Sequence, residues 1–453
     1  MGKKYNFDYI IIGSGPAGST AALTLAKSKK HIAIIEQQNF GGNHLNSRDI
    51  PYKVSLGFSH TFSHLSNRPE ISGQELHYNF PTIVSHQSFI TSTLSDDRKK
   101  ELENAGVTCI NGYANFLDKH TVAVGDQKYT ADYFILATGS ELKTSEIAGL
   151  DTVNYLTPST AIKVRRLPKF VFVIGGGPSG CEIAEYFAEL GAKVLIMERA
   201  GRILPHEDKE VSSTIKDYFT NELGIMVVPS ARVVAVSQDG PIKRVIFNIN
   251  GQEKMVRVDC IVLATGSSPI TDYGLENAGV KYKRTGIGAD SSFRTSQKHI
   301  FAIGDALGGP SSTERAEYQA SILANNILRK SKNPINYTGF IRITNTCPEI
   351  ATVGSNELEL SKQKKKFKKS IVYLNELLPC KAGQLDYGFV KILADRSGHI
   401  LGATIVAPNA GLMAEEIAMA IRHHLTALEI ASTPHISDSP NYAIKLAAKK
   451  LIK

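Results

Sequence analysis

Cysteine is scarce in this chain of 453 residues, and its few positions argue against two kinds of protein. The five cysteines are odd in number and scattered, and no two of them form a Cys-x-x-Cys pair. Such a pattern indicates neither a disulphide framework nor a zinc cluster. Scattered cysteines fit a reducing compartment. The positions are Cys109, Cys181, Cys260, Cys347 and Cys380.

Signals for membranes and secretion are also lacking. No apolar run reaches the roughly 20 residues that a membrane-spanning helix needs. We expect the first strand to begin near Asp8, which leaves no room for a signal peptide. Asn6 stands where a myristoylation signal requires serine or threonine. We therefore expect a cytoplasmic protein.

The composition is that of a soluble globular protein with an excess of positive charge. Apolar residues make up 42% and charged residues 21%, and the length predicts about three domains. The formal net charge of +9 favours anionic ligands such as dinucleotides. A nucleic-acid surface would need that charge gathered beside stacking aromatic residues. The one dense run, residues 362–369, is interpreted as a solvated helix face or loop, so no nucleic-acid partner is expected.

Residues 8–36 contain every part of a dinucleotide-binding unit. An apolar run leads into a glycine-rich turn, a small-residue helix over about 17–27, and a second apolar run that ends on Glu36. The three glycines allow a sharp turn, a close approach to a pyrophosphate and tight helix packing. Glu36 is placed to accept a hydrogen bond from a ribose hydroxyl, while a purely structural turn is the alternative. The turn residues are Gly13, Gly15, Pro16, Ala17 and Gly18.

The same pattern returns from Phe170, with a strand, a glycine turn, a helix over 181–190 and a strand that ends on Glu198. A carboxylate at that position accepts from a free 2′-hydroxyl and repels a 2′-phosphate, which favours NADH over NADPH. Arg199 follows and offers a cation to a phosphate, so NADPH stays open. The turn residues are Gly175, Gly177 and Gly180.

Short motifs at strand ends accompany both units. A buried strand that begins at Tyr133 leads to Thr138-Gly139, an ending that brings backbone close to a nucleotide. Thr265-Gly266 closes the second unit after a meander over 233–262. A strand over 299–303 leads to Gly304-Asp305 and a helix over about 313–329.

Residues 338–453 carry no glycine fingerprint. Two strands, 389–393 and 400–406, flank a hairpin turn, and apolar residues over 412–423 recur at helical spacing. We interpret this block as a separate α+β unit for assembly.

In this order the motifs resemble the pyridine nucleotide–disulphide oxidoreductases, which include dihydrolipoamide dehydrogenase, glutathione reductase, mercuric reductase and the soluble transhydrogenase. The likeness extends from Asp8 to about Ala448. Several runs are similar to dihydrolipoamide dehydrogenase in particular. They are residues 202–205, 348–354 and 401–403.

The resemblance implies an α/β fold with two Rossmann-like dinucleotide-binding domains and a C-terminal α+β dimerisation domain. FAD would bind domain 1–150, completed by 271–330, and NAD(P)H would bind domain 151–270. A homodimer would form through residues 338–453.

The resemblance also assigns site residues. Asp305 would hydrogen-bond the flavin ribitol, and Lys53 would lie near flavin N5, restrained by Glu182. A lysine there stabilises the negative charge of reduced flavin; two surface charges are the alternative. The FAD residues are Gly13, Gly15, Pro16, Ala17, Gly18, Glu36, Gly42, Lys53, Thr138, Gly139, Gly304 and Asp305, and the NAD(P)H residues are Gly175, Gly177, Gly180, Glu198 and Gly266.

The family's redox disulphide is missing. In the family pattern Gly-Gly-Thr-Cys-Leu-Asn-x-Gly-Cys-Ile-Pro-Ser-Lys, the two cysteines correspond to His44 and Asp49 of this chain. Without a thiolate beside the flavin, no dithiol passes electrons onward. An anionic Asp49 would lower the flavin potential, and an Asp49 protonated by burial would donate a proton. Capping a helix turn or pairing with Arg48 is the equal alternative, and His44 is interpreted as a packed or hydrogen-bonded filler.

The family's acid–base histidine, in the pattern His-Pro-Thr-x-x-Glu, is displaced as well. His435 with Asp438 could form a displaced acid–base pair, whereas an ordinary interface histidine is the favoured interpretation. Cys347 replaces the family's aspartate before Pro-Glu and is interpreted as a packed residue.

The sequence therefore predicts a dimeric FAD-dependent NAD(P)H oxidoreductase with a non-disulphide acceptor. That acceptor would be a second pyridine nucleotide, a quinone, a dye or oxygen. The alternatives are a dihydrolipoamide dehydrogenase-like reductase that uses other cysteines, and a non-catalytic flavin-binding scaffold. An enzyme held at a membrane by the lysine-rich helix 443–453 is a further alternative, for which a solvated helix at the dimer edge is favoured.

Overall fold

The computed structural model of the chain describes residues 5–66, 68, 71, 76–143, 147–383, 385 and 387–452. The chain divides into two compact units, each made of three segments. The first unit is Met1–Ser55, Asn79–Thr144 and Gly266–Asn336, and the second is Leu56–Tyr78, Ser145–Thr265 and Tyr337–Lys453. The domain limits expected from the sequence, 1–150 with 271–330, 151–270 and 338–453, remain predictions.

The first unit is built on a seven-stranded sheet with the order β3-β2-β1-β6-β5-β4, and β18 also pairs with β6. Strands β1, β2, β3 and β18 run parallel to one another and to the inner part of β6. Its strands and helices are β1 (Phe7–Ile12), α1 (Pro16–Leu25), β2 (Ile32–Glu36), α2 (Gly42–Asn46), α3 (Asp49–Ser66, which continues into the second unit), α4 (Phe80–Asn104), β3 (Thr108–Asn111), β4 (Ala114–Phe116), β5 (Thr121–Val124), β6 (Gln127–Leu136), β7 (Ser140–Leu142), β15 (Ser267–Pro269), β16 (Tyr282–Lys283), β17 (Gly286–Ile287), β18 (Ile300–Ala302), the 3-10 helix η3 (Gly304–Leu307) and α8 (Thr313–Arg329).

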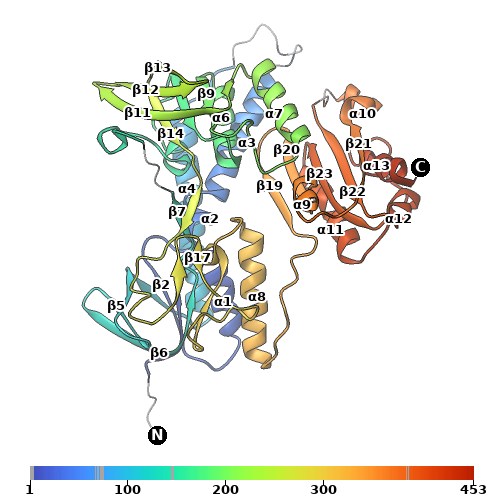
Figure 1. Ribbon diagram of the computed structural model, residues 1–453. Coiled ribbons are helices and arrows are strands. Elements are labelled where there is room, and N and C mark those ends of the chain that lie inside the picture. Colours follow the sequence, from blue (N-terminus) through green and yellow to red (C-terminus); the bar gives the residue numbers. More distant parts are fainter. Residues whose placement is uncertain are drawn as a thin grey trace. The chain divides into compact units, whose positions relative to one another are not determined.

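Alternate side chains of this sheet enter two different cores, as the two-residue period of a strand requires. Ile11 and Ile34 pack with α1 and α8 on one face, whereas Ile10 and Ile35 pack on the other. Helices α1 and α8 lie side by side on the first face (Figure 1). The carboxyl ends of β1, β6 and β18 therefore meet at one edge of a sheet that is buried on both faces.

The expected start of β6 at Tyr133 was wrong. The strand begins at Gln127, because its outer half pairs antiparallel with β5 before its inner half joins β1. That partner change gives no signal in the apolar pattern of the sequence.

The second unit holds three sheets. A parallel sheet has the order β10-β9-β8-β14, an antiparallel sheet has the order β11-β12-β13, and a five-stranded sheet has the order β19-β20-β23-β22-β21. The elements are η2 (Leu150–Thr152), α5 (Pro158–Ala161), β8 (Phe170–Ile174), α6 (Pro178–Glu189), β9 (Lys193–Met197), α7 (Lys209–Asn221), β10 (Met226–Val228), β11 (Ala231–Asp239), β12 (Ile242–Ile249), β13 (Gln252–Val258), β14 (Cys260–Leu263), β19 (Ile341–Thr344), β20 (Glu349–Gly354), α9 (Glu357–Lys362), β21 (Lys368–Tyr373), η4 (Leu374–Glu376), α10 (Leu378–Ala382), β22 (Phe389–Ala394), β23 (Ile400–Ala407), α11 (Ala410–Arg422), α12 (Ala427–Ser432) and α13 (Tyr442–Ile452).

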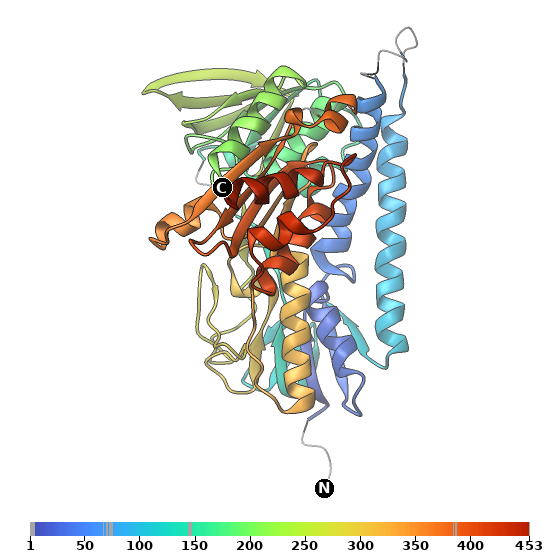
Figure 2. The same cartoon turned by 90° about the vertical axis from the view of Figure 1, so that its right-hand side faces the viewer.

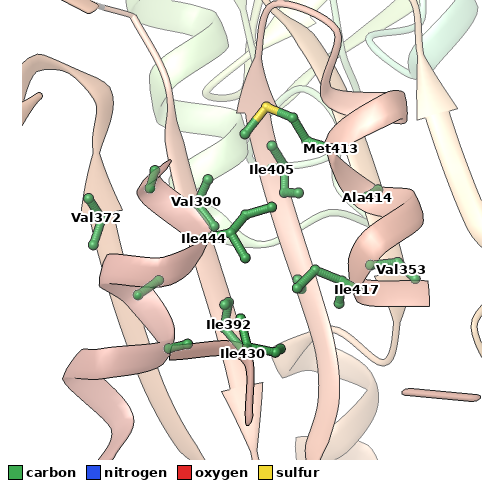
Figure 3. Close-up of a cluster of buried hydrophobic side chains, with 14 of the residues drawn as sticks. Val353, Val372, Val390, Ile392, Ile405, Met413, Ala414, Ile417, Ile430 and Ile444 are labelled. Atoms are coloured by element: carbon green, nitrogen blue, oxygen red, sulfur yellow. The ribbon is translucent and has the colours of Figure 1, made fainter. Parts of the chain in front are cut away.

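The five-stranded sheet is covered by α11 and α13, drawn in the dark red of the C-terminal residues (Figure 2). Ile405 of β23, Ile417 of α11 and Ile444 of α13 pack in one buried core beneath these helices (Figure 3). The apolar side of α13 is therefore covered by the sheet, which leaves little apolar surface for the membrane-bound alternative. Residue 453 of the expected helix lies outside the described residues.

None of the helices among the described residues combines the length and the apolar composition that crossing a bilayer requires.

A buried lysine joins the five-stranded sheet to helices α7 and α9. The ammonium group of Lys391 lies 2.8 Å from Asp208, 2.8 Å from Glu210 and 2.5 Å from Glu357, and its side chain is only 1% exposed. Burial alone would raise the pKa of Glu210, but its hydrogen bond from Lys391 holds that pKa below the usual range. The three acidic side chains lie close enough together to hold a metal ion, and the lysine occupies the place of the cation.

We expect Lys391→Met to lower the free energy of unfolding by about 3–5 kcal/mol, because it leaves buried carboxylates without a counter-charge. Guanidinium unfolding at pH 7 measures the effect, and the exposed Lys366→Met should change stability by less than about 0.5 kcal/mol. The pKa of Glu210 is lowered in the folded state, so the ionised Glu210 side chain adds to the free energy of unfolding at neutral pH. This stabilisation is lost as pH falls through the lowered pKa. The difference between variant and wild type should therefore shrink in acid; a difference that is small at pH 7 would contradict this reading.

Candidate functional site

The first glycine turn is shaped by contacts that leave no room for a side chain. Gly13 has a φ of +99°, and a Cβ there would lie 2.3 Å from the carbonyl oxygen of Ala137. A Cβ on Gly18 would lie 1.8 Å from the carbonyl oxygen of Gly13. A Cβ on Gly15 meets nothing within 4 Å. The protein itself therefore requires two of the three glycines, while the third faces open space at the N-terminus of α1, where the sequence predicts a pyrophosphate.

The carboxylate of Glu36 braces this turn from the end of β2. It accepts hydrogen bonds from the backbone N–H of Ser14 (2.9 Å), from the Ser14 hydroxyl (2.7 Å) and from the N–H of Gln38 (3.0 Å). The Ser14 hydroxyl also accepts from the N–H of Gly41, and a Cβ on Gly42 would lie 2.7 Å from Cα of Gly15. The 41–42 segment is thus held against the turn, and Ser14 is a bracing residue that the sequence pattern did not single out.

Asp305 lies just past the end of β18, in η3. Its Oδ2 accepts a hydrogen bond from the Ser140 hydroxyl at 2.8 Å and another from Ser311. Arg48 approaches the same oxygen at 3.9 Å. A Cβ on Gly304 would lie 3.1 Å from Cβ of Ala17, so η3 is packed against the start of α1. Thr138 and Gly139 follow β6 directly, at the same edge of the sheet.

His44 and Asp49 form a hydrogen-bonded pair at the positions where the resemblance places the two redox cysteines. His44 Nδ1 lies 2.7 Å from Asp49 Oδ2, and the Thr313 hydroxyl donates to the same oxygen at 2.6 Å. Thr313 also lies 3.0 Å from His44 Nδ1. The side chain of Asp49 is half exposed and that of His44 is about one-quarter exposed, so both are open to small molecules.

The direction of the Asp49 pKa contradicts one of the alternatives, protonation by burial. Burial alone would raise its pKa, but the hydrogen bonds from His44 and Thr313, together with Arg48, hold that pKa below the usual range, so burial does not protonate Asp49. Its close partners are His44 and Thr313, whereas the Arg48 guanidinium hydrogen-bonds Ser311 at 3.2 Å. Thr313 was missed because it is distant in sequence and is brought in only as the first residue of α8.

The second glycine turn repeats the construction of the first. A Cβ on Gly175 would lie 2.4 Å from the carbonyl oxygen of Ala264, and a Cβ on Gly180 would lie 2.0 Å from that of Gly175. A Cβ on Gly177 meets nothing within 4 Å. Glu198 accepts from the N–H groups of residues 176 and 200, each at 2.7 Å.

Two assignments of the second site involve the other unit. Gly266 belongs to the first unit, and its contact with NAD(P)H remains a prediction. Glu182 is buried on α6 and accepts from the backbone N–H of Asn345 at 2.7 Å and from its side-chain amide at 3.1 Å. Lys53 is exposed on α3 in the first unit, so its pairing with Glu182 also remains a prediction.

His435 is engaged within its own chain by Glu416, so the alternative pair with Asp438 does not form, and the favoured interpretation as an interface histidine remains a prediction. His435 Nε2 lies 2.9 Å from Glu416 of α11, and Nδ1 lies 2.9 Å from the carbonyl oxygen of Thr433. Its side chain is 3% exposed, whereas Asp438 accepts from the hydroxyl of Ser437. The partner precedes His435 by 19 residues and reaches it only through the packing of α11, so local spacing gave no signal for it.

None of the five cysteines, all of them among the described residues, forms a disulphide, and none lies in the segment that carries His44 and Asp49. Burial, with the nearby carboxylates of Glu185 and Glu189, raises the pKa of Cys347 to about 12. Burial likewise raises the pKa of Cys109 and of Cys260 to about 11. These thiols stay protonated at neutral pH, which makes them poor nucleophiles.

Known proteins match the chain over nearly its whole length. The family profile described as pyridine nucleotide-disulphide oxidoreductase matches residues 7–320, and that family's dimerisation domain profile matches residues 341–448. Mercuric reductase of Bacillus cereus is 30% identical over 435 residues, which cover 95% of this chain and 69% of that protein. Dihydrolipoyl dehydrogenase of Geobacillus stearothermophilus is 31% identical over 442 residues, covering 94% and 92%.

Solved structures are similar in fold. LpdA from Mycobacterium tuberculosis superposes with a TM-score of 0.88 at 26% identity, covering 98% of this chain and 99% of that one. The HOCl-induced flavoprotein disulfide reductase RclA from Escherichia coli has a TM-score of 0.88 at 22% identity, covering 99% and 100%. The profile matches and these structures confirm the predicted α/β fold with a C-terminal dimerisation domain, and the second profile supports the predicted homodimer.

The open glycines provide a direct test of cofactor placement. Because a Cβ at Gly15 meets no protein atom, Gly15→Ala should fold normally yet bind FAD at least about tenfold more weakly, a change of roughly 1.4 kcal/mol. Gly177→Ala should keep FAD and lose NADH affinity by a similar factor. Flavin content per chain and NADH titration measure the two effects, and Gly57→Ala, which also meets no protein atom within 4 Å, should change neither. If Gly15→Ala bound FAD as tightly as wild type does, the hypothesis that the pyrophosphate lies at this turn would be wrong.

Proposed function

The chain belongs to the pyridine nucleotide-disulphide oxidoreductase family, and we propose that it is a flavoprotein that moves electrons from NADH or NADPH to an acceptor other than a disulphide. One observation carries the proposal: His44 and Asp49, which stand in place of the redox cysteines, are joined by a hydrogen bond of 2.7 Å. A histidine–aspartate pair holds protons and charge, but it cannot accept an electron pair as a disulphide does.

No thiol of this chain is suited to replace the missing pair. The cysteine nearest in sequence is Cys109, which follows Asp49 by 60 residues and whose pKa burial raises to about 11. A thiol–disulphide relay needs two cysteines within bonding distance of each other, and one of them must be readily ionised. None of the five cysteines, all within the described residues, forms a disulphide, and burial raises the pKa of four of them, Cys109, Cys181, Cys260 and Cys347.

The two cofactor sites are assigned from the geometry of the turns. Gly15 and Gly177 leave room for the two pyrophosphates, and Glu36 and Glu198 are placed to accept from ribose hydroxyls. Asp305, already oriented by the hydroxyl of Ser140, would accept from the flavin ribitol. When bound, the nicotinamide and the flavin supply the hydride chemistry, and the protein supplies orientation and electrostatics.

Asp49 and His44 act on charge and protons. An ionised Asp49 beside the flavin disfavours added negative charge, and it orients the imidazole by accepting from Nδ1. Nδ1 then carries the proton, which leaves Nε2 as the ring nitrogen that exchanges a proton with a bound acceptor. This arrangement suits an acceptor that takes up protons with electrons, such as a quinone, and does not obstruct direct hydride transfer to a second pyridine nucleotide.

Anaerobic reduction followed by acceptor trials tests the proposal. The purified protein should carry FAD, bleach on addition of NADH more readily than with NADPH, and recover its colour with a quinone, a dye, oxygen or a second pyridine nucleotide. Each single Cys→Ser variant should retain this activity, because no thiol takes part. Turnover of lipoamide or glutathione would instead establish a disulphide reductase. If neither NADH nor NADPH bleached the flavin, the protein would be a non-catalytic flavin-binding scaffold. If the protein did not bind FAD, the proposal would be wrong.

The charge of Asp49 predicts a shift in flavin potential. Asp49→Asn removes a negative charge and should raise the two-electron midpoint potential by roughly 30 mV, equivalent to about 1.4 kcal/mol. Spectroelectrochemical titration measures the potential. Asp118→Asn, at an exposed turn of the same unit, should leave it unchanged. Equal potentials in wild type and Asp49→Asn would mean that this carboxylate does not act on the flavin.

A further inference from the structure

A histidine and two glutamates form a buried cluster inside the second unit, apart from either glycine turn. His60 comes from α3, and Glu185 and Glu189 lie one helical turn apart on α6. The side chain of Glu185 is 0% exposed and that of Glu189 is 1% exposed. One potential ligand atom from each of the three residues lies within 4.8 Å of the other two.

The distances in this cluster are those of metal ligands rather than of hydrogen-bonded groups. His60 Nε2 lies 3.5 Å from Glu185 Oε2 and 3.7 Å from Glu189 Oε2. The nitrogen is fully buried and has no hydrogen-bond partner. Two atoms bound to one Zn²⁺ at about 2.0–2.2 Å with tetrahedral angles are separated by roughly 3.3–3.6 Å. The nitrogen therefore stands at about the right distance from both carboxylate oxygens for a shared ion.

The cluster lacks an internal counter-charge. In the described part of the chain, no lysine or arginine pairs with either glutamate, and His60 is the one basic residue in contact. The acidic cluster around Lys391 shows the contrasting case, in which one ammonium group lies within 2.5–2.8 Å of three carboxylates and supplies a counter-charge. A divalent cation would do the same for Glu185 and Glu189.

Both carboxylates are also oriented by groups behind them. The Ser59 hydroxyl donates to Glu189 Oε2 at 2.6 Å, and the backbone N–H of Cys347 donates to both oxygens of Glu185, at 2.9 and 3.1 Å. Hydrogen bonds of this kind hold metal-ligating carboxylates in protein sites.

We infer that His60, Glu185 and Glu189 form a binding site for a divalent transition-metal ion of the Zn²⁺ type. One imidazole nitrogen and two carboxylate oxygens are ligands that Zn²⁺ accepts, and solvent completes the shell. The ion ties α3 to α6 and, through the Cys347 N–H, to the segment that precedes β20. It stabilises the second unit and takes no part in electron transfer.

Zn²⁺ titration of the full-length FAD-loaded protein after EDTA treatment tests the inference. Calorimetry should show one Zn²⁺ per chain, and the melting temperature should rise when Zn²⁺ is added. His60→Gln and Glu189→Gln should each weaken Zn²⁺ binding by more than about tenfold, since even the loss of an outer-shell partner costs roughly 10–100-fold. His64→Gln, one turn further along α3 and exposed, should bind like wild type.

The Glu189→Gln variant separates loss of a ligand from loss of the fold. Gln keeps the size of the Glu189 side chain but cannot become an anionic ligand, so the metal-free variant should melt close to the temperature of metal-free wild type while showing no rise with Zn²⁺. Wild type that binds no Zn²⁺, or a His60→Gln or Glu189→Gln variant that binds it like wild type, would overturn the inference. So would a His64→Gln variant that loses binding as fully as His60→Gln.

Discussion

Both glycine turns depend on close backbone contacts that only glycine permits, because any Cβ would clash. These contacts determine where both nucleotides would lie. Gly13 and Gly175 each follow a strand. A Cβ on Gly13 would lie 2.3 Å, and a Cβ on Gly175 2.4 Å, from a carbonyl oxygen at the end of the neighbouring strand. At Gly18 and Gly180 the following helix approaches the turn still more closely. These contacts press each helix N-terminus against the carboxyl edge of its sheet, where its unpaired N–H groups face solvent. A Cβ on the middle glycine of each turn would meet no protein atom within 4 Å, so its lack of a side chain is left to be explained by a ligand.

At the place of the missing disulphide, a covalent bond is replaced by a short hydrogen bond. The His44–Asp49 contact keeps two segments together, α2 and the start of α3, and Thr313 adds α8 to the same carboxylate oxygen. The segments that would carry the two cysteines are thus still held together, and under the proposed function the pair would place protons and charge instead of storing electrons. His435 fits the same change, since both of its ring nitrogens are occupied by Glu416 and Thr433 of its own chain.

Patterns that depend on neighbouring residues could be predicted from the sequence, whereas contacts between distant segments could not. The glycine turns, their strands and helices, and the acidic residues that end β2 and follow β9 were all predictable, because each unit is local and has a fixed period. The start of β6, the partners of Asp49 and the partner of His435 depend on which distant element packs alongside, and no spacing encodes that. The sequence left open whether Asp49 is ionised for the same reason: the hydrogen bonds from His44 and Thr313, together with the charge of Arg48, outweigh desolvation, and Thr313 is 264 residues away.

The lysine buried in β22 has an evolutionary consequence. Lys391 and the carboxylates of Asp208, Glu210 and Glu357 come from segments up to 183 residues apart, yet one buried ammonium group contacts all three carboxylates. Substitutions at these four positions are therefore not independent in their effects on fitness. A neutral residue at position 391 is compatible with a stable fold only after some of the acidic residues have been replaced. The order in which these substitutions accumulate is therefore constrained. Related chains should exchange this group as a set, with apolar side chains replacing lysine and acids together.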